Sequence, residues 1–416
     1  MTSGKVGFMK DLSMDADFPP HIIQAEGSQS IPNGHLRPLG YQRSPENPVE
    51  DYEGIVDAQI MYNNYISQNL PVVFRDSILD SPVFENWEKD DYLKERYGSV
   101  NVSVVTRKGI KREYLIRERK TLKMKKFLLE YMYEDWYLAG TVPLEMLKEL
   151  PLPKCVQCGS VANYLREAEL WMSSGGTSSQ IHAHNDHYLH CVLFGRRDFI
   201  LIENAYKDAF EFRNEFPNSL GGHSPLDMDF INAIKYKKIS TTPWTWATLQ
   251  QGDCILIPAG FLHQVRSYGR SISETILITP TPFFDATGCD KKQYKKPKTL
   301  ADAAFMWSFE EGKRVLKNWN LNAESLRYLL LAELRTQEKL PIEQFIVFYQ
   351  EAMVWGQEDL VPGATVFAML FETGTREVTR EDIMNLSPEK LKKAAKIFNK
   401  PYVDRPRKSQ HKHTEL

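Results

Sequence analysis

The chain has 416 residues, of which 42% are hydrophobic and 25% charged, and its formal net charge is −2. This length allows a large core and more than one domain, and the near-neutral charge gives no reason to expect a nucleic acid as partner. No apolar run reaches the roughly eighteen residues of a membrane helix, and the N-terminus lacks the apolar core of a signal peptide. We therefore expect an intracellular protein, in the cytoplasm or the nucleus, without a membrane segment.

The N-terminal part divides into an irregular lead-in and an α/β region. Residues 1–45 are polar, contain Pro and Gly, and have no periodicity, which predicts a poorly ordered segment. Residues 46–165 carry helical and strand patterns, with helices expected at 57–68, 87–97 and 124–133 and strands at 70–74 and 100–105. This α/β region is expected to pack on the domain that follows it.

Residues 166–282 have the pattern of an all-β domain. Turn residues separate short apolar runs, which predict strands at 168–172, 188–193, 199–202, 246–249, 254–257 and 271–278. The long irregular stretch at 204–244 is of the kind that forms the wall of a binding site. Four residues in or beside it are candidates for shaping a substrate groove, although loop acids and packing aromatics account for them equally well: Asp227, Asp229, Trp244 and Trp246.

The C-terminal part is predominantly helical. A basic linker at 283–299 precedes a helical region at 300–400, with helices expected at 301–319, 323–334, 342–355, 363–371, 379–386 and 387–398. The last residues, 401–416, are expected to be disordered.

The five cysteines are too few and too irregularly spaced to predict a disulfide framework. Cys155 and Cys158 form a single Cys-x-x-Cys pair without a second half of a zinc site, so we interpret them as two reduced thiols in a loop. Cys191 and Cys254 lie within apolar strand patterns and are expected to be small core residues.

A cluster of histidines is the strongest chemical signal in the sequence. Four of the ten histidines fall within nine residues: His182, His184, His187 and His190. Because residues i and i+2 of a strand share a face, His182, His184 and Asp186 would point the same way. A fifth histidine, His263, follows the apolar strand and Pro/Gly turn at 252–262. Two side chains from one strand and one histidine from a distant strand are typical of a facial metal site with open positions.

These motifs resemble the JmjC (cupin-type) 2-oxoglutarate oxygenases over residues 34–280. The resemblance rests on "LPVVFRDSILDSPVFENW", "SSGGTSSQIH", "GRRDFILI" and "GDCILIPAGFLHQVRSYGRSIS". It implies an α+β protein with a double-stranded β-helix barrel, and an Fe(II) ion held by His182, the position of His184, and His263. It also implies that Arg197 and Ser179 bind the far carboxylate of 2-oxoglutarate, with Thr275 beside the cosubstrate.

One position departs from the family pattern, because His184 stands where the family has a carboxylate. In one interpretation His182, His184 and His263 form a three-histidine site, in which copper or zinc competes better with iron. In another, the strand is used two residues further along and Asp186 is the carboxylate ligand. In a third, the site has decayed and the protein is a non-catalytic scaffold.

Residues 323–386 resemble a pair of EF-hand units, most visibly in "ATVFAMLFETGTREVTREDI". The loops lack the alternating oxygen ligands, inner Gly and terminal Glu of a calcium site, so calcium binding is not expected. These helix pairs are expected to pack on the barrel or to mediate homodimer formation.

The leading hypothesis is a non-heme iron, 2-oxoglutarate-dependent dioxygenase that hydroxylates a protein side chain or a small molecule. The neutral charge and the lack of a recognisable histone-reader module favour a hydroxylase over a histone demethylase. The alternatives are a non-enzymatic binding protein and a three-histidine cupin oxidase that works without 2-oxoglutarate.

Overall fold

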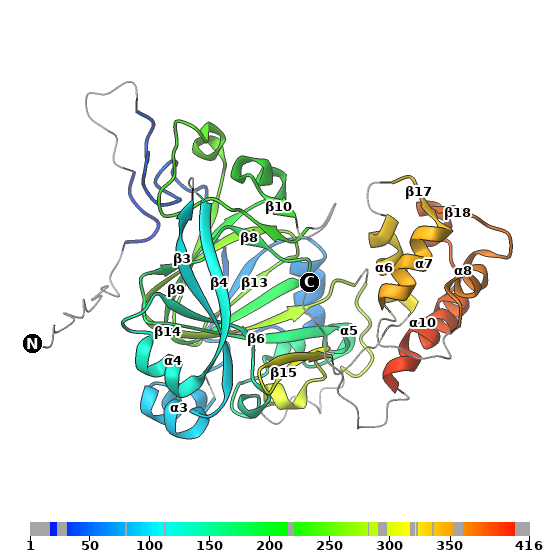
Figure 1. The fold of residues 1–416 in the computed structure, drawn as a ribbon, viewed down its shortest axis with the longest axis horizontal. Helices are drawn as coiled ribbons and strands as arrows, with labels where there is room; N and C mark the ends of the chain where they lie inside the picture. Colours follow the sequence, from blue (N-terminus) through cyan, green and yellow to red (C-terminus); the bar gives the residue numbers. More distant parts are fainter. Residues whose placement is uncertain are drawn as a thin grey trace, which may run out of the picture. The chain divides into compact units, whose positions relative to one another are not determined.

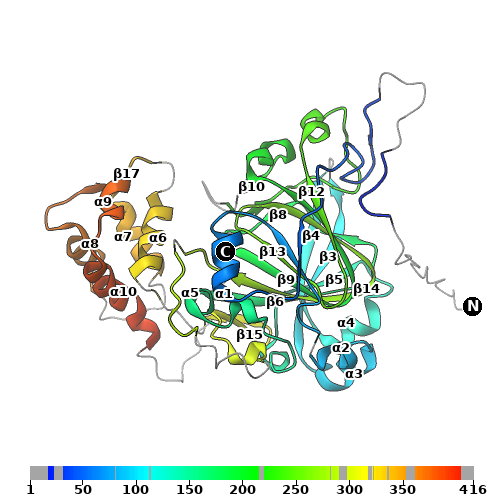
Figure 2. The same cartoon turned by 180° about the vertical axis from the view of Figure 1, so that it is seen from behind.

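The structure is a computed structural model that describes residues 17–22, 31–79, 81–111, 114–214, 220–281, 283–289, 298–316, 321, 323–334, 337–352 and 361–403. The chain divides into two compact units. The first comprises Met1–Pro280 and Phe284–Val315, and the second Thr281–Phe283 and Leu316–Leu416. Figures 1 and 2 show a barrel of strands with short helices around it in the first unit, and a group of helices in the second.

Strands β1 to β14 of the first unit form one large hydrogen-bonded sheet. In chain order they are β1 (Glu50–Glu53), β2 (Val72–Arg75), β3 (Asn101–Lys111), β4 (Tyr114–Lys123), β5 (Trp136–Thr141), β6 (Leu165–Ser173), β7 (Thr177–Ser178), β8 (His182–Ala183), β9 (His187–Ile202), β10 (Arg213–Asn214), β11 (Gly222–His223), β12 (Thr245–Leu249), β13 (Cys254–Ile257) and β14 (Leu262–Ile278). Adjacent strands follow the order β1-β2-β13-β9-β14-β6-β5-β3-β4, and β7, β8, β10, β11 and β12 branch from this path.

Two long antiparallel strands, β9 and β14, belong to both faces of the barrel. The first half of β9 pairs with β13 and its second half with β12. The first half of β14 pairs with β7 and β8, and its second half with β6. Two sheets are thereby closed on each other, which gives a jelly-roll barrel. The predicted α+β class with a cupin-type barrel is confirmed.

The long strands turn their corner together. Gly195 has φ +78°, and a Cβ atom there would lie 2.3 Å from the carbonyl oxygen of Arg270 on β14. The register between the strands shifts between Tyr268 and Ile272, at the same level. A glycine is needed here because only glycine adopts this conformation and approaches the partner backbone so closely. The strands predicted at 188–193 and 199–202 are therefore two halves of β9.

Hydrophobic clusters cover both faces of β9. Val192, Phe199 and Leu201 point into the barrel, in a cluster with residues of β12, β13 and β14. Leu189 and Cys191 point outward into the cluster beneath the helices. Coverage on both sides explains why nearly every residue of β9 is buried, in contrast to the alternation of a half-exposed strand.

The helices largely follow the sequence patterns. The first unit has α1 (Ala58–Ile60) continued by η1 (Met61–Ile66), α2 (Val83–Asn86), α3 (Asp90–Tyr97), α4 (Met124–Glu130) and α5 (Gly159–Asn163). The second unit has α6 (Ala323–Leu334), α7 (Ile342–Ala352), α8 (Gly363–Phe371), α9 (Arg380–Met384) and α10 (Pro388–Val403). Strands β17 (Lys339–Pro341) and β18 (Glu377–Thr379) pair between the two helix–loop–helix segments of this unit.

The helix predicted at 301–319 is wrong for its described residues. They form a short 3-10 turn, η7 (Leu300–Asp302), and a hairpin of β15 (Trp307–Glu310) and β16 (Lys313–Leu316). Glu311 and Gly312 between the strands have φ values of 50° and 84°. Positive φ at both turn residues is the geometry of a tight hairpin, and it ends any helix. Residues 317–319 lie outside the described residues.

Part of the segment expected to be poorly ordered packs against the barrel unit. Leu39 is buried, and Leu36 N–H donates to the carbonyl oxygen of Ile231 at 2.7 Å. Residues 1–16 and 23–30, residues 290–297 of the predicted linker and residues 404–416 of the tail lie outside the described part of the chain.

The structure corrects the interpretation of the cysteines. Disulfides join Cys158 to Cys289 and Cys191 to Cys254, and the remaining cysteine, Cys155, is buried. The spacing gave no hint of these pairs because each joins residues from distant segments, across 131 and 63 positions respectively.

Candidate metal centre

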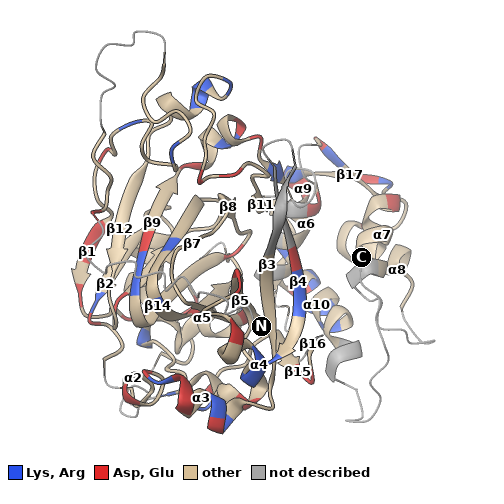
Figure 3. Cartoon of the chain, turned by 60° about the vertical axis from the view of Figure 1, so that its left-hand side comes forward, with Lys and Arg blue, Asp and Glu red and all other residues tan. Residues whose placement is uncertain are grey.

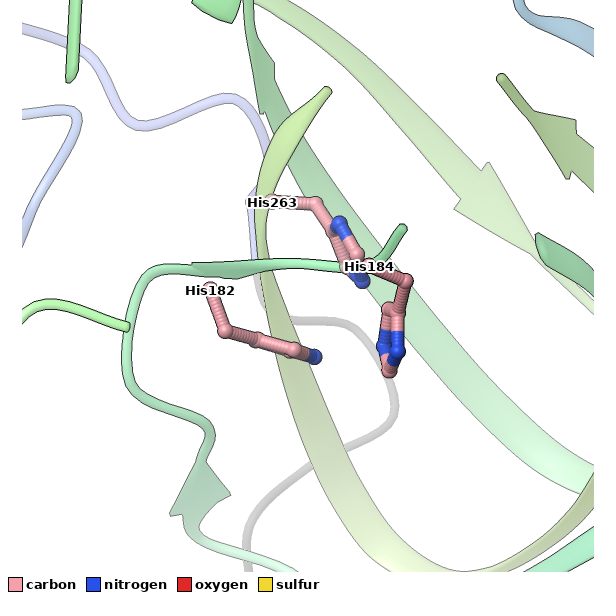
Figure 4. A group of neighbouring side chains, drawn as sticks. All are labelled: His182, His184 and His263. Carbon is pink, nitrogen blue, oxygen red and sulfur yellow. The ribbon is translucent and has the colours of Figure 1, made fainter. Parts of the chain in front are cut away.

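Three histidines converge at one end of the barrel. His182 lies on β8 and pairs directly with His263 on β14, while His184 follows His182 by two residues and shares its face. Their potential ligand atoms all lie within 4.8 Å of one another. Figure 4 shows the three rings turned toward a common space. The two-residue spacing from His182 to His184 and the register of β8 with β14 together create the cluster.

Backbone carbonyl groups orient two of the rings. Nδ1 of His182 donates to the carbonyl oxygen of Gln180 at 2.9 Å, and Nδ1 of His263 donates to that of Phe261 at 3.1 Å. In each ring Nε2 then carries the lone pair, which is how ligating histidines are commonly held. Nε2 of His184 and Nε2 of His263 are buried and have no hydrogen-bond partner.

Burial also keeps these rings neutral. The pKa values of His184 and His263 are well below the ordinary histidine value, mainly because both rings are buried. The neighbouring His182 lowers both pKa values further. Neutral imidazoles with buried, unsatisfied lone pairs suit a divalent transition metal, so the donor set fits such an ion.

Asp186, the alternative ligand, lies outside this group. Its carboxylate is bound by Arg166 at 2.5 Å and by the hydroxyl of Thr279 at 3.1 Å. Among the described residues, the only group of His, Cys, Asp and Glu side chains placed to hold a metal is His182, His184 and His263. The two-residue slip of register therefore does not occur in this structure.

His187 fixes the turn that leads to His263. Its Nδ1 accepts a hydrogen bond from the backbone N–H of Ala259 at 3.1 Å, within the Pro/Gly turn before β14. Burial lowers the pKa of His187 to about 4, so the ring is neutral and can accept this bond. His187 thus acts on the site by positioning, which the sequence did not predict for it.

Arg197 points into the barrel interior and is fully buried. Its guanidinium donates to the hydroxyl of Tyr137 at 2.8 Å and makes a long contact of 3.5 Å with the carbonyl oxygen of Trp171. Its Nε atom has no partner, and no carboxylate of the described residues forms an ion pair with the guanidinium. The adjacent Arg196, in contrast, forms a two-point ion pair with Asp198. A buried cation without a direct ion-pair partner is costly, so an anionic ligand beside Arg197 would be stabilised.

A hydroxyl and ring network connects Arg197 to the histidines. Nε1 of Trp171 donates to the hydroxyl of Thr275 at 2.9 Å, and that hydroxyl lies 2.8 Å from Nδ1 of His190. The hydroxyl of Tyr188 also lies 3.0 Å from the same nitrogen, and the Tyr188 ring stacks on His184. This side of the barrel is therefore a continuous polar surface, in which Thr275 occupies a central position.

Ser179, which is expected to bind the cosubstrate, makes a structural contact. Its hydroxyl oxygen accepts from the backbone N–H of Val265 at 2.9 Å, which fixes the approach to β8 against β14. The hydroxyl still has its own proton to donate, so an anion near it would be compatible with this contact.

The structure adds Tyr137 and Trp171 to the candidate residues. Tyr137 lies on β5, a strand that the sequence patterns did not predict, and no local signal marked it. Two groove candidates have packing or turn roles instead: Trp244 donates to the carbonyl oxygen of Arg43, and Asp227 accepts from the N–H of Asp229.

Comparison with known proteins agrees with this geometry. Residues 57–286, more than half of the chain, match the family described as cupin-like domain. The chain belongs to this family. Among the described helices of this cupin-like protein, none combines the length and apolar character that a membrane span needs.

Three distant relatives of this cupin-like protein bear JmjC-related names. It is 24% identical over 216 residues to the lysine-specific demethylase JMJ30 of Arabidopsis thaliana, covering 50% of each chain. It is 29% identical over 108 residues to the Jumonji C domain-containing protein 5 of Drosophila melanogaster, covering 26% of each. The demethylase JMJ31 of Arabidopsis thaliana is 24% identical over 262 residues, with 53% of this chain and 48% of the relative covered. The chain thus spans about half or less of the relatives it matches, and the EF-hand-like assignment of residues 323–386 receives no support from these comparisons.

Proposed function

We propose that this cupin-like protein is a metal-dependent 2-oxoglutarate oxygenase. The observation that carries the proposal is Arg197, a buried guanidinium that forms no ion pair with a carboxylate of the described residues, in the same barrel as three converging histidines. A dicarboxylate whose far end meets Arg197 would supply the missing counter-ion. The resemblance to JmjC proteins supports the same conclusion.

The protein's residues would divide the work by position. His182, His184 and His263 would hold the metal, Fe(II) by family resemblance, on one side and leave coordination positions open on the other. Arg197 and Tyr137 would bind and orient the far carboxylate of the cosubstrate. When bound, the metal and 2-oxoglutarate supply the oxidising chemistry. The apolar barrel interior behind them would exclude water from the reacting atoms.

The first test is the metal content of protein purified anaerobically, measured by elemental mass spectrometry. It is followed by measurement of succinate released with Fe(II), 2-oxoglutarate and O2. We expect about one iron per chain and succinate formation even without a substrate. The His263→Ala variant serves as control and should lose both metal and turnover. No stoichiometric metal after reconstitution would favour the non-catalytic scaffold.

A second candidate function follows from His184. A neutral imidazole in place of a carboxylate raises the net charge of the site by one and makes copper or zinc more competitive. A tightly held copper or zinc ion without succinate formation would indicate a three-histidine oxidase that does not use 2-oxoglutarate. The unpaired Arg197 argues against this candidate, because that enzyme would have no need of an anion site in the barrel.

Substrate, compartment and assembly stay predictions. Two relatives are named lysine-specific demethylases, and we nevertheless favour hydroxylation of a protein side chain or small molecule, for the compositional reasons given above. The two disulfides argue against the predicted cytoplasmic or nuclear location, because disulfides persist mainly in oxidising compartments. We also expect that the second unit mediates homodimer formation and that it does not bind calcium.

A further inference from the structure

A row of four basic side chains crosses the sheet at the metal centre. His263 on β14 pairs with His182 on β8, His182 pairs with His223 on β11, and His223 pairs with Arg213 on β10. Directly opposed residues of antiparallel strands project from the same face. His223 and Arg213 therefore continue the line of the two candidate ligands, on the side of the sheet that holds the metal site.

The inner end of this row is buried and its outer end is exposed. His263 is 1% exposed, His182 is half-buried, and His223 and Arg213 are exposed. The metal centre thus opens to solvent in the direction of β11 and β10, and a substrate that reaches the open coordination positions would pass over His223 and Arg213. Neighbouring strands lie about 4.8 Å apart, so the two side chains stand about 5 and 10 Å from His182.

The two outer strands are tied firmly to the ligand strand. Oδ1 of Asn185, the residue after His184, accepts from the backbone N–H groups of Leu220 at 2.9 Å and Gly221 at 3.0 Å, immediately before β11. Gly222 has φ +149°, and a Cβ atom there would lie 2.1 Å from the carbonyl oxygen of Arg213. Only glycine permits this close approach of β10. These contacts hold β11 and β10, and with them His223 and Arg213, beside the metal centre.

We propose that His223 and Arg213 bind an acidic side chain of a peptide substrate, beside the residue that is oxidised. A guanidinium and an imidazole both donate hydrogen bonds to a carboxylate, and a guanidinium does so at two points. In an extended peptide, which rises about 3.3 Å per residue, distances of about 5 and 10 Å correspond to about one and a half and three residues, which places the acidic residue one to three positions from the oxidised one. This inference rests on the proposed function, because it takes the histidine cluster as the reaction centre.

The test measures binding rather than turnover. The 416-residue protein is titrated into fluorescently labelled hexaglutamate or hexaglutamine peptide, and the anisotropy of the peptide is measured. The titration is done with the wild type, with Arg213→Gln, His223→Gln and Arg213→Lys, and with the control Lys237→Gln. Lys237 lies exposed in η5 (Lys237–Thr241), outside the row. We expect the wild type to prefer hexaglutamate. Arg213→Gln and His223→Gln should each weaken hexaglutamate binding about three- to fivefold, the range for exposed charge pairs, while Arg213→Lys retains most of the affinity.

Manganese then locates the bound peptide. With Mn(II) added, the proton resonances of hexaglutamate should broaden in the wild type and much less in the double variant Arg213→Gln/His223→Gln. No preference of the wild type for hexaglutamate, or equal losses in Lys237→Gln, would overturn the inference. If Mn(II) does not bind but the anisotropy results hold, the acidic site stands and the proposed oxygenase function fails. If Mn(II) binds and the anisotropy results do not hold, the acidic site fails alone.

Discussion

Replacing Arg197 by Met should change stability and cosubstrate binding in opposite directions. Arg197 is fully buried, its Nε is unsatisfied, and its contacts are the hydroxyl of Tyr137 and a long approach to a carbonyl oxygen. A buried ion costs several kcal/mol, and one hydrogen bond to a charged group offsets only about 1.5–3 kcal/mol. Methionine has a similar length without the charge. We therefore expect Arg197→Met to raise the free energy of unfolding of the ligand-free protein by about 1–3 kcal/mol.

The same change should nearly abolish binding of 2-oxoglutarate. Removing one member of a buried ion pair costs about 3–5 kcal/mol, because the other charge is left uncompensated. Because 1.4 kcal/mol corresponds to a tenfold change in Kd, this loss raises the Kd of 2-oxoglutarate by roughly two to three and a half orders of magnitude. Calorimetric titration of 2-oxoglutarate into Mn(II)-loaded, anaerobic protein measures the affinity, and denaturant unfolding without ligand measures the stability.

The adjacent arginine provides a matched control. Arg196 is paired at two points with Asp198, which is fully buried. Figure 3 shows basic and acidic segments among the strands of the barrel. Arg196→Met would leave Asp198 buried without its partner, so it should lower the free energy of unfolding by about 3–5 kcal/mol and leave 2-oxoglutarate affinity unchanged. The reasoning would be refuted if Arg197→Met lowered the free energy of unfolding as much as Arg196→Met does. It would also be refuted if Arg197→Met bound 2-oxoglutarate with the affinity of the wild type.

Three further predictions concern other parts of the molecule. His184→Ala should reduce bound metal to a small fraction of one per chain while Asp186→Asn keeps it, as measured by elemental mass spectrometry; equal metal in both would contradict the three-histidine site. Both carboxyl oxygens of Glu274 are buried without a hydrogen-bond partner, and burial raises the pKa of this group well above 4.5. The native state then retains a proton that the unfolded chain releases, so this group costs stability as pH rises above about 4.5. In thermal melts Glu274→Gln should have a higher Tm than the wild type, by an amount that grows from pH 5 to pH 8. A Tm difference that does not change with pH would refute the raised pKa of Glu274. Finally, alkylation of the unfolded, unreduced protein should add one group, at Cys155, and five after reduction; more than one before reduction would restore the interpretation as free thiols.

Much of the candidate centre was readable from local sequence. The i, i+2 rule placed His182 and His184 on one face, and the strand-and-turn pattern before His263 marked the second element of the site. Local sequence could not choose between His184 and Asp186, because both positions fit the same face of a strand. The choice depends on Arg166 and Thr279, which hold the carboxylate of Asp186 and lie 20 and 93 residues away from it.

The sequence by itself determined the kind of elements and the family. Helices such as Ala323–Leu334 and strands such as Cys254–Ile257 appear where periodicity predicted them, because each pattern is set by neighbours within a few residues. Only the tertiary structure decided the disulfide pairs, the burial of Arg197 without an ion pair to a described carboxylate, and the row that runs from His263 to Arg213. These features depend on how strands that are far apart in the chain pair with one another, and on which side chains that pairing buries. A one-residue slip in pairing would change every contact across the sheet while leaving each strand's own pattern intact.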